Sequence, residues 1–148
     1  MAKSLKVNDL IGIRYVPHGR TLAGLDCYGL VKIVFARCGI ELPEYDADYH
    51  DYERIKEIYL TERNTPPWEQ ASGYDEYPLL LAIRFGTPFV NHCGVYIGNG
   101  KFIHTRENIG VVIEDISLWK RRIEGAYRYV QVNNNKKPVQ PSEGQGNN

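Results

Sequence analysis

The chain has 148 residues, of which 43% are hydrophobic, and this size and composition are typical of one globular domain with one core. Lys and Arg together number 18, as do Asp and Glu, so the formal net charge is zero. This balance gives no electrostatic attraction to nucleic acid or to an anionic membrane, and neither is expected as a partner. No apolar run approaches the ~20 residues that a membrane-spanning helix needs.

The start of the chain and its cysteines both point to a reducing compartment. Residues 1–20 lack the apolar stretch of a secretory signal, so synthesis in a cytoplasm is expected. Cys27, Cys38 and Cys93 are too few for a disulfide framework and odd in number. We therefore expect free thiols.

The first half of the chain is predicted to be helical. Residues 5–15 are predicted to form a short helix or turn that leads into a loop. A helix is predicted over about residues 27–38, with Asp26 at its N-cap and Gly39 at its end. Its apolar residues form one stripe: Leu30, Val31, Val34, Phe35 and Cys38. A more polar amphipathic helix is predicted over residues 50–64, followed by a Pro- and Gly-rich loop over residues 65–78.

The second half changes to short apolar runs separated by turn signals. Strands are predicted over residues 79–85, 93–98, 101–105, 110–115 and 126–132, with a short helix or turn over residues 116–125. From residue 133 the chain is polar and rich in Pro and Gly, which predicts a disordered tail over residues 133–148 behind a domain of residues 1–132. The predicted fold class is α+β, with N-terminal helices packed on an antiparallel sheet.

Cys27 stands where a helix begins, and two interpretations of it are open. A helix N-terminus lowers the pKa of a thiol, because the unpaired N–H groups and the helix dipole favour a thiolate. Cys27 also belongs to the apolar stripe, however, and buried cysteine is often mere packing. A nearby Asp26 carboxylate would raise the pKa of the thiol.

A nucleophilic cysteine needs a base, and the base needs an orienting group. His50 lies in a polar stretch where solvation is expected, and His18 lies in a loop near Cys27 in sequence. His92 and His104 bracket a predicted hairpin whose strands are otherwise apolar. These two histidines could meet, with one orienting the other.

The register of this hairpin decides whether the two histidines can meet. A plain two-residue loop at Asn99-Gly100 would place Val95 opposite His104 and His92 on the other face of the sheet. One extra residue in the loop or one bulge would place Gly94 opposite His104 and both histidines on one face. We predict the second arrangement, with an odd-numbered loop, a G1-type bulge at residues 98–100, and room for the His104 ring beside Gly94.

A zinc site is the competing use of Cys27, His92 and His104, which could hold the metal with one open position. The chain has no Cys or His pair at the short spacing usual in structural zinc sites. We therefore expect neither a metal nor another cofactor.

Four motifs in order resemble the NlpC/P60 cysteine peptidases, papain-like enzymes that cut peptidoglycan stem peptides. They are the loop tyrosine Tyr15 in GIRYVPHGR, DCYGLV at 26–31, HCGVYIGNGKFIHT at 92–105, and His104 itself. The resemblance runs from about residue 10 to residue 130. The ending GVVIEDISLWKRRIEGAYRYV looks like the variant found in tailed bacteriophages, whose members are tail-associated cell-wall hydrolases.

The resemblance implies a role for each matching residue. Cys27 would be the nucleophile, His92 the general base and His104 the group that orients His92. The Tyr15 hydroxyl and the Cys27 backbone N–H would stabilise the oxyanion, although Tyr15 could also be an ordinary tyrosine at a loop edge. The Asp-Cys-Ser unit of many members helps to hold a substrate amine, so Asp26 and the residue two places on, Tyr28, are candidate substrate-binding residues.

This sequence departs from the family pattern in ways that leave the exact bond open. Tyr28 replaces the usual serine, as in the phage-like variant, and Cys93 replaces a valine after the base. No role beyond packing is expected for Cys93 or Cys38. The expected reaction is hydrolysis of the D-γ-glutamyl–diamino acid bond of a peptidoglycan stem peptide. The expected location is a virion tail assembled in a bacterial cytoplasm, with other tail proteins as partners. Two alternatives stay open, a tail-tip assembly protein that only binds and a thiol amidase or acyltransferase with another substrate.

Overall fold

A computed structural model describes residues 4–45, 47 and 51–130 of the chain. His50, the end of the predicted last strand at residues 131–132 and the predicted tail over residues 133–148 lie outside the described residues. None of the described helices has the length and apolar character needed to cross a membrane.

An antiparallel sheet with two α-helices beside it forms the fold, which confirms the predicted α+β class. The helices are α1 (Cys27–Arg37) and α2 (Tyr52–Glu62). The sheet has the order β3-β8-β4-β5-β6-β7. Its strands are β3 (Trp68–Gln70), β4 (Leu79–Ile83), β5 (His92–Gly98), β6 (Lys101–Arg106), β7 (Gly110–Asp115) and β8 (Ile123–Tyr129). Outside it lie a small hairpin, β1 (Arg20–Thr21) with β2 (Gly24–Leu25), and two short 3-10 turns, η1 (Asn8–Leu10) and η2 (Ile116–Leu118).

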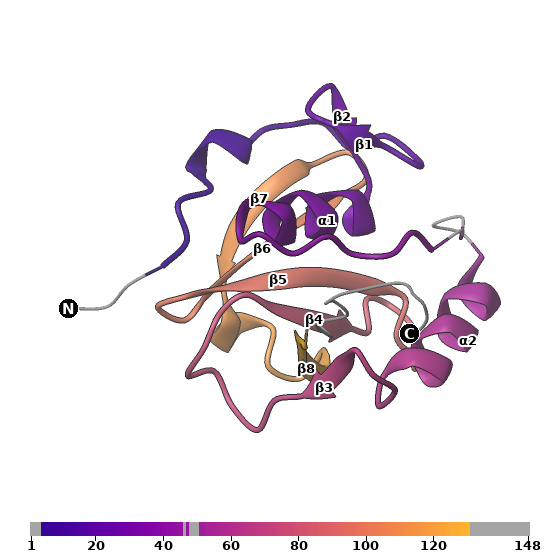
Figure 1. The fold of residues 1–148 in the computed structure, drawn as a ribbon. Coiled ribbons are helices and arrows are strands. Elements are labelled where there is room, and N and C mark those ends of the chain that lie inside the picture. The colour runs from indigo at the N-terminus through magenta and orange to yellow at the C-terminus, as the bar shows by residue number, and fades with distance from the viewer. Residues whose placement is uncertain (1–3, 46, 48–50, 131–148) are drawn as a thin grey trace, which may run out of the picture.

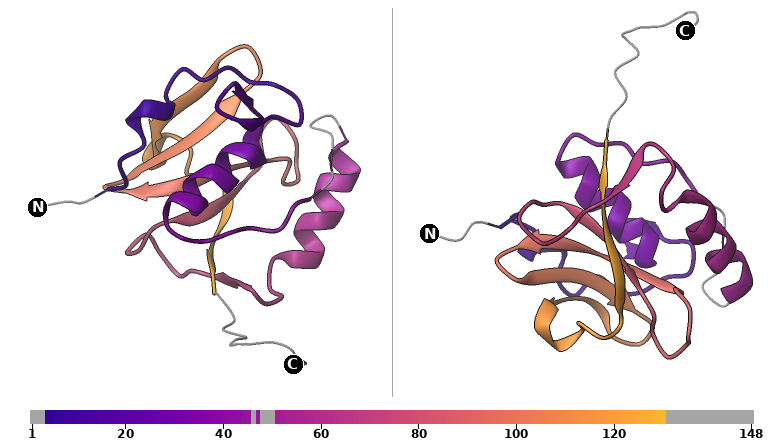
Figure 2. Two further views of the ribbon diagram at one scale, coloured as in Figure 1. Left: turned by 45° about the horizontal axis from the view of Figure 1, so that its top comes forward. Right: turned by 90° about the horizontal axis from the view of Figure 1, so that it is seen from below.

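The two helices lie in different places relative to the sheet. Helix α1 lies across β5 and β6, and the β1–β2 hairpin stands over its N-terminal end (Figure 1). Helix α2 stands apart from α1 at one side of the molecule (Figure 2). It contains no buried residue, and it reaches the sheet through the Tyr59 hydroxyl, 2.7 Å from that of Tyr127. The predicted helix over residues 50–64 is thus confirmed in a shorter form.

Helix α1 forms where the capping residue and the apolar stripe predicted it. The Asp26 side chain accepts a hydrogen bond of 2.7 Å from the Gly29 N–H, as an N-cap does. The stripe is buried in the core through Leu30, Val31, Val34 and Phe35. Burying each such side chain contributes about 1.5–3 kcal/mol, so this face anchors the helix start to the sheet.

Replacing Gly29 by alanine is expected to destabilise the fold by about 1–3 kcal/mol, the usual cost of overpacking. A Cβ at Gly29 would overlap the backbone carbonyl oxygen of Gly19, which cannot move like a side chain. Urea unfolding measures the loss. Gly73→Ala is the matched control, because a Cβ there meets nothing within 4 Å. Equal midpoints for both variants would contradict this tight approach.

The structure differs from the predicted elements in three places. Strand β3 lies inside the segment predicted as a loop, and β8 begins at Ile123, inside the segment predicted as a helix or turn. The β1–β2 hairpin was not predicted either. Strands of two or three residues are too short to show a period of two. Strands β1 and β2 pair with each other, whereas β3 forms because a distant strand supplies its hydrogen bonds. That strand is β8, with Trp68 opposite Tyr129.

The β5–β6 hairpin has the register that brings the two histidines together. Val95 pairs with Ile103 and Tyr96 with Phe102, so continuing the register places Gly94 opposite His104. A Cβ at Gly94 would lie 3.0 Å from the His104 Cβ, which confirms that the missing side chain makes room there. The predicted bulge is present but lies between Tyr96 and Gly98, earlier than expected.

The turn of this hairpin explains why the bulge lies in β5 and not in the loop. Asn99 and Gly100 have φ angles of 55° and 71°, the two positive values that a tight type I′ turn requires. The turn therefore keeps two residues, and the predicted odd-numbered loop is wrong. The extra residue is accommodated in β5 before Gly98, whose own φ is 99°.

Candidate active site

A chain of hydrogen bonds crosses β5, β6 and β7. His92 Nε2 lies 2.9 Å from His104 Nδ1, and His104 Nε2 lies 2.6 Å from Glu114 Oε2. The Trp119 indole N–H donates to the other carboxylate oxygen, Oε1, over 3.2 Å. His104 is fully buried and His92 is 3% exposed. The expected contact between the two histidines is therefore formed in the core, out of water.

Cys27 and His92 line the same cleft, where α1 begins beside β5. Because His92 Nε2 faces His104, Nδ1 is the nitrogen left for the thiol. This Nδ1 is buried and has no hydrogen-bond partner among the described residues. A nitrogen of this kind can take the proton of the thiol as a general base. The structure therefore brings together Cys27, His92 and His104, as the hairpin register required.

The electrostatics around Cys27 favour a thiolate. The pKa of Cys27 is lowered to about 5, first by a hydrogen bond from the Cys93 thiol and then by the neighbouring His92 imidazole. Burial and the Asp26 carboxylate act in the opposite direction but are outweighed. The same contact, together with burial, raises the pKa of Cys93, which stays a thiol. Cys93 is thus more than packing, in contrast to its sequence-based interpretation.

Replacing Cys93 by alanine is expected to raise the pKa of Cys27 and to slow its alkylation near neutral pH. The variant loses the S–H donor that stabilises the Cys27 thiolate. The rate of iodoacetamide alkylation is measured against pH, with mass spectrometry to identify the modified residue. Cys38→Ala is the control, because Cys38 lies at the far end of α1. A Cys27 profile that does not move in Cys93→Ala would contradict the prediction.

His104 is a neutral imidazole at physiological pH. Burial is the main reason that its pKa is lowered to about 4, and the neighbouring His92 lowers it further. The rings of Phe102 and Trp119 lie 4.6 and 4.8 Å from its ring, centroid to centroid. Glu114 acts against this lowering, and its own pKa is lowered because hydrogen bonds from His104 and Trp119 outweigh its burial. A neutral His104 next to an ionised Glu114 is the resulting state.

Asp26 and Tyr28 flank Cys27, and both are held by neighbours. Asp26 is 7% exposed and accepts from Arg20 over 2.6 Å in addition to capping α1. The Tyr28 hydroxyl donates to the Pro43 carbonyl over 2.6 Å, and Arg20 lies over the Tyr28 ring. Arg20 and Tyr28 line the cleft. Asp26 therefore acts on this wall of the cleft by holding Arg20 in place.

Tyr15 lies beside the chain segment that leads into Cys27. It forms a parallel bridge with Leu25, two residues before Cys27, and it is partly buried. Tyr15 does not line the cleft that contains His92. Tyr15 therefore lies next to the start of α1 and outside the lining of that cleft.

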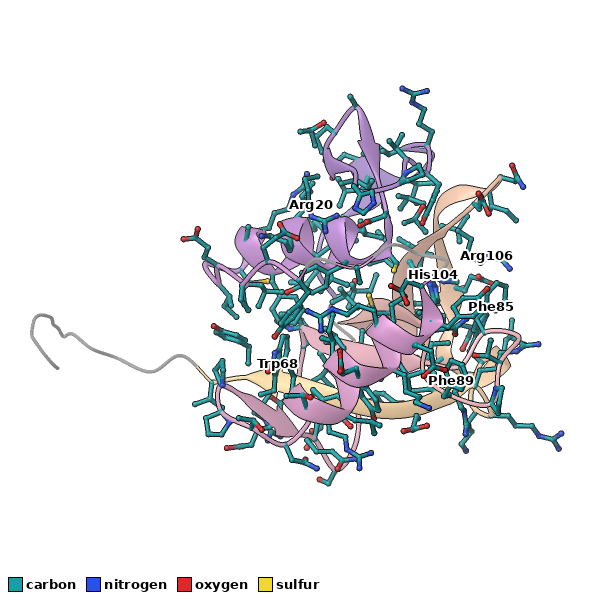
Figure 3. The ribbon with its side chains drawn as sticks, turned by 90° about the vertical axis from the view of Figure 1, so that its right-hand side faces the viewer. Arg20, Trp68, Phe85, Phe89, His104 and Arg106 are labelled. Atoms are coloured by element: carbon teal, nitrogen blue, oxygen red, sulfur yellow. The ribbon has the colours of Figure 1, made fainter. Side chains whose placement is uncertain are left out.

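The cleft beside Cys27 is a cavity of about 140 Å³ with mostly apolar walls. One wall comes from α1, one from α2 and one from the sheet. Figure 3 views this side of the molecule, with α2 in front, Arg20 above it and Trp68 to its left. Cys27 and His92 lie on its surface, so a substrate entering here meets the thiol and the imidazole together.

Sequence reasoning did not identify four residues of this arrangement: Arg20, Cys93, Glu114 and Trp119. A carboxylate within an apolar strand and a tryptophan in a basic turn were the available signals for Glu114 and Trp119. Among the described residues, no group of three Cys, His, Asp or Glu side chains could hold a metal ion. His92 and His104 bond to each other and do not converge on one point, which argues against the zinc alternative.

A thiol on the first turn of a helix, next to a histidine pair on an antiparallel sheet, defines a cysteine-nucleophile class of site. No family model matches the chain. The chain is 32% identical over 123 residues to murein DD-endopeptidase MepS/murein LD-carboxypeptidase of Escherichia coli K12 and covers 57% of that protein and 81% of itself. It is 31% identical over 118 residues to the probable endopeptidase NlpC homolog of Haemophilus influenzae, covering 54% of that protein and 77% of itself.

A phage protein and a solved structure are also similar. Tail tip assembly protein K of Escherichia phage lambda is 27% identical over 131 residues, which cover 60% of it and 83% of this chain. An NLP/P60 family structure from Staphylococcus aureus Mu50 superposes with a TM-score of 0.58 at 22% identity, covering 39% of that chain and 84% of this one. The chain is therefore similar to NlpC/P60 proteins in its sequence and in its fold. It spans little more than half the length of the curated relatives it matches.

Proposed function

We propose that this protein is a cysteine peptidase that hydrolyses an amide bond in peptidoglycan stem peptides. The observation that carries the proposal is the ordered set of groups around Cys27. The set comprises a thiol of lowered pKa, an unpaired buried nitrogen of His92 in the same cleft, and His104 on the far nitrogen of His92. A packing cysteine would need none of these groups. The name of the E. coli relative, a murein endopeptidase, supports a peptidoglycan substrate, and the name of the H. influenzae relative, a probable endopeptidase, supports cleavage of a peptide.

In the first half of the reaction, the Cys27 thiolate attacks the carbonyl carbon of the amide and a C–S bond forms. The carbonyl oxygen becomes an oxyanion, for which the Tyr15 hydroxyl and the Cys27 backbone N–H are the proposed donors. His92 holds the thiol proton and gives it to the leaving amine as the C–N bond breaks. The product is an acyl thioester on Cys27 and a free amine.

In the second half, water attacks the thioester carbonyl while His92 accepts one proton from the water. The C–S bond breaks, a carboxylic acid leaves, and the Cys27 thiolate stands again beside a protonated His92, as at the start of the first half. His104 keeps the His92 ring in one orientation through both halves over their 2.9 Å hydrogen bond. Each group thus returns to its starting protonation state.

For the substrate, we propose the D-γ-glutamyl–diamino acid bond. Asp26 and Tyr28 are the proposed substrate-binding residues, because Tyr28 lines the cleft and Asp26 holds Arg20 in that wall. For the setting, we propose a virion tail, with other tail proteins as partners and local opening of the cell wall as the task. The similarity to tail tip assembly protein K of phage lambda supports the tail location.

The experiment is a digest of purified peptidoglycan with wild-type protein and with Cys27→Ala, read by mass spectrometry of the released fragments. New amine and carboxyl ends that are absent from the Cys27→Ala digest would establish the activity and identify the bond. If the folded wild-type protein cleaves no wall of several chemotypes, the proposal fails and a binding role in the tail gains support.

A further inference from the structure

Glu114 occupies a position that the catalytic roles above leave unexplained. It lies near the end of β7, diagonal to His104 on the neighbouring strand, since His104 pairs with Val112 and Phe102 with Glu114. Each of its carboxylate oxygens meets a different partner, the His104 ring on one side and the Trp119 indole on the other. Figure 3 shows Phe85 and Arg106 on the same side of the molecule as His104.

The Trp119 indole gives this network a direction. An indole N–H can only donate, so the group that faces it must accept. An ionised carboxylate can accept at both oxygens, which leaves the His104-facing oxygen as an acceptor too. His104 must therefore donate from Nε2. Because His104 is neutral and carries one ring proton, its Nδ1 must accept from His92.

We propose that Glu114 is a positioning residue that sets the direction of every proton in the Cys27–His92–His104 chain. Its carboxylate holds the His104 proton on Nε2, so that His104 Nδ1 accepts from His92 Nε2–H. His92 Nδ1 is then the nitrogen with a free lone pair, and it is the one available to Cys27. The proposal deepens the proposed function and rests on it.

Glu114 also compensates the positive charge that forms on His92 during proton transfer. His92 becomes a cation when it takes the thiol proton, and the neutral His104 alone cannot balance that charge. Glu114 provides a negative charge one ring away. Arg106 is a further charged side chain that acts on His104 and Glu114. Its Cζ atom lies 5.1 Å from the ring centroid of Phe85 and 5.7 Å from that of Trp119.

Glu114→Gln tests the direction of the protons, because glutamine can accept with only one of its two terminal atoms. Its oxygen must face Trp119, so its NH₂ faces His104 Nε2 and forces that nitrogen to accept. The single His104 proton then moves to His104 Nδ1, which points at His92 Nε2. Because His92 Nε2 must now accept, the His92 proton moves to His92 Nδ1, the nitrogen that faces Cys27. We expect kcat to fall by about 10²-fold or more, within the 10²–10⁴ that general-base catalysis supplies, with a smaller change in KM.

Adding Trp119→Phe to Glu114→Gln is expected to restore activity at least tenfold over Glu114→Gln. Without the indole N–H, the glutamine is free to turn its oxygen toward His104 and to return the proton to Nε2. Phenylalanine keeps an aromatic ring against Phe102 and His104. A residue that only supported packing would make the double variant worse than either single variant. Glu69→Gln, an exposed carboxylate bonded to Arg128, is the control expected to behave as wild type.

A second readout needs no substrate. ¹⁵N NMR of the histidine rings, recorded in the Cys27→Ala background, should place the His104 proton on Nε2 with Glu114 and on Nδ1 with Glu114→Gln. An unchanged His104 tautomer, or a double variant no more active than Glu114→Gln, would overturn the proposal. If wild-type protein cleaves no peptidoglycan, the proposed function fails, while the tautomer measurement still decides the role of Glu114.

Discussion

Replacing His92 by alanine is expected to lower kcat for stem-peptide cleavage by about 10²–10⁴-fold, the range that a positioned general base supplies. The variant loses the proton acceptor for Cys27 and the donor to the leaving amine. It also loses the imidazole with which His92 lowers the pKa of Cys27, so the pKa of the thiol rises. The thiolate fraction near neutral pH falls as a result, and alkylation of Cys27 should slow in parallel with cleavage.

The measurement combines initial cleavage rates with the pH profile of Cys27 alkylation. His92→Ala leaves the buried His104 Nδ1 unpaired, at a cost of about 1–3 kcal/mol, so thermal unfolding is recorded as well. His92→Gln can still donate to His104 and provides a folded variant without a base. His18→Asn is the control, because asparagine tolerates the positive φ of 60° at that exposed loop position. Loss of activity in His18→Asn but not in His92→Gln would move the base to His18.

Replacing Tyr15 by phenylalanine is expected to lower kcat by about 10²–10³-fold, the usual effect of removing one oxyanion donor. The loss should fall on kcat and leave KM nearly unchanged, because the oxyanion exists only in the transition state and in the intermediates that follow it. The position of Tyr15 beside Leu25, just before Cys27, motivates the prediction. The phenyl ring should keep the packing of the tyrosine.

Steady-state kinetics on a synthetic stem peptide separate kcat from KM for this variant. Tyr74→Phe is the matched control, since Tyr74 is 42% exposed and lies against Tyr96, away from the cleft lining. A Tyr15→Phe enzyme with wild-type kcat would assign the oxyanion to backbone N–H groups alone. An equal rise in KM and unchanged kcat would instead make Tyr15 a substrate-binding residue.

The hairpin shows how far sequence reasoning reached. The alternation of apolar residues and the Asn99-Gly100 turn predicted the strands, and the chemical need for two histidines on one face selected the register. The register is confirmed, and the bulge lies in β5 because the two-residue turn is complete by itself. A register slip of one residue moves every side chain to the other face, so this local choice governs the whole candidate site.

The features that the sequence did not predict share a physical cause. Strand β3 and the first residues of β8 have no periodic pattern of their own. Strand β3 forms because it pairs with the last residues of β8, and the first residues of β8 form a strand because they pair with β4. Glu114 acquires its role from a hydrogen bond to His104, a residue of another strand. Trp119 acquires its role from a hydrogen bond to Glu114 and from its ring contact with His104. The acidity of Cys27 depends on Cys93, a residue 66 positions later that the sequence pattern assigned to packing.

Sequence alone determined the features that depend on near neighbours. These are the capped helix that begins at Cys27, the hairpin that carries His92 and His104, and the α+β class. Each rests on interactions within a few residues, so its signal is contiguous in the chain. Only the tertiary structure decided the proton network through Glu114, the thiol pair of Cys27 and Cys93, and the apolar cleft under α2. These depend on burial and hydrogen bonds between elements far apart in sequence, which leave no local pattern.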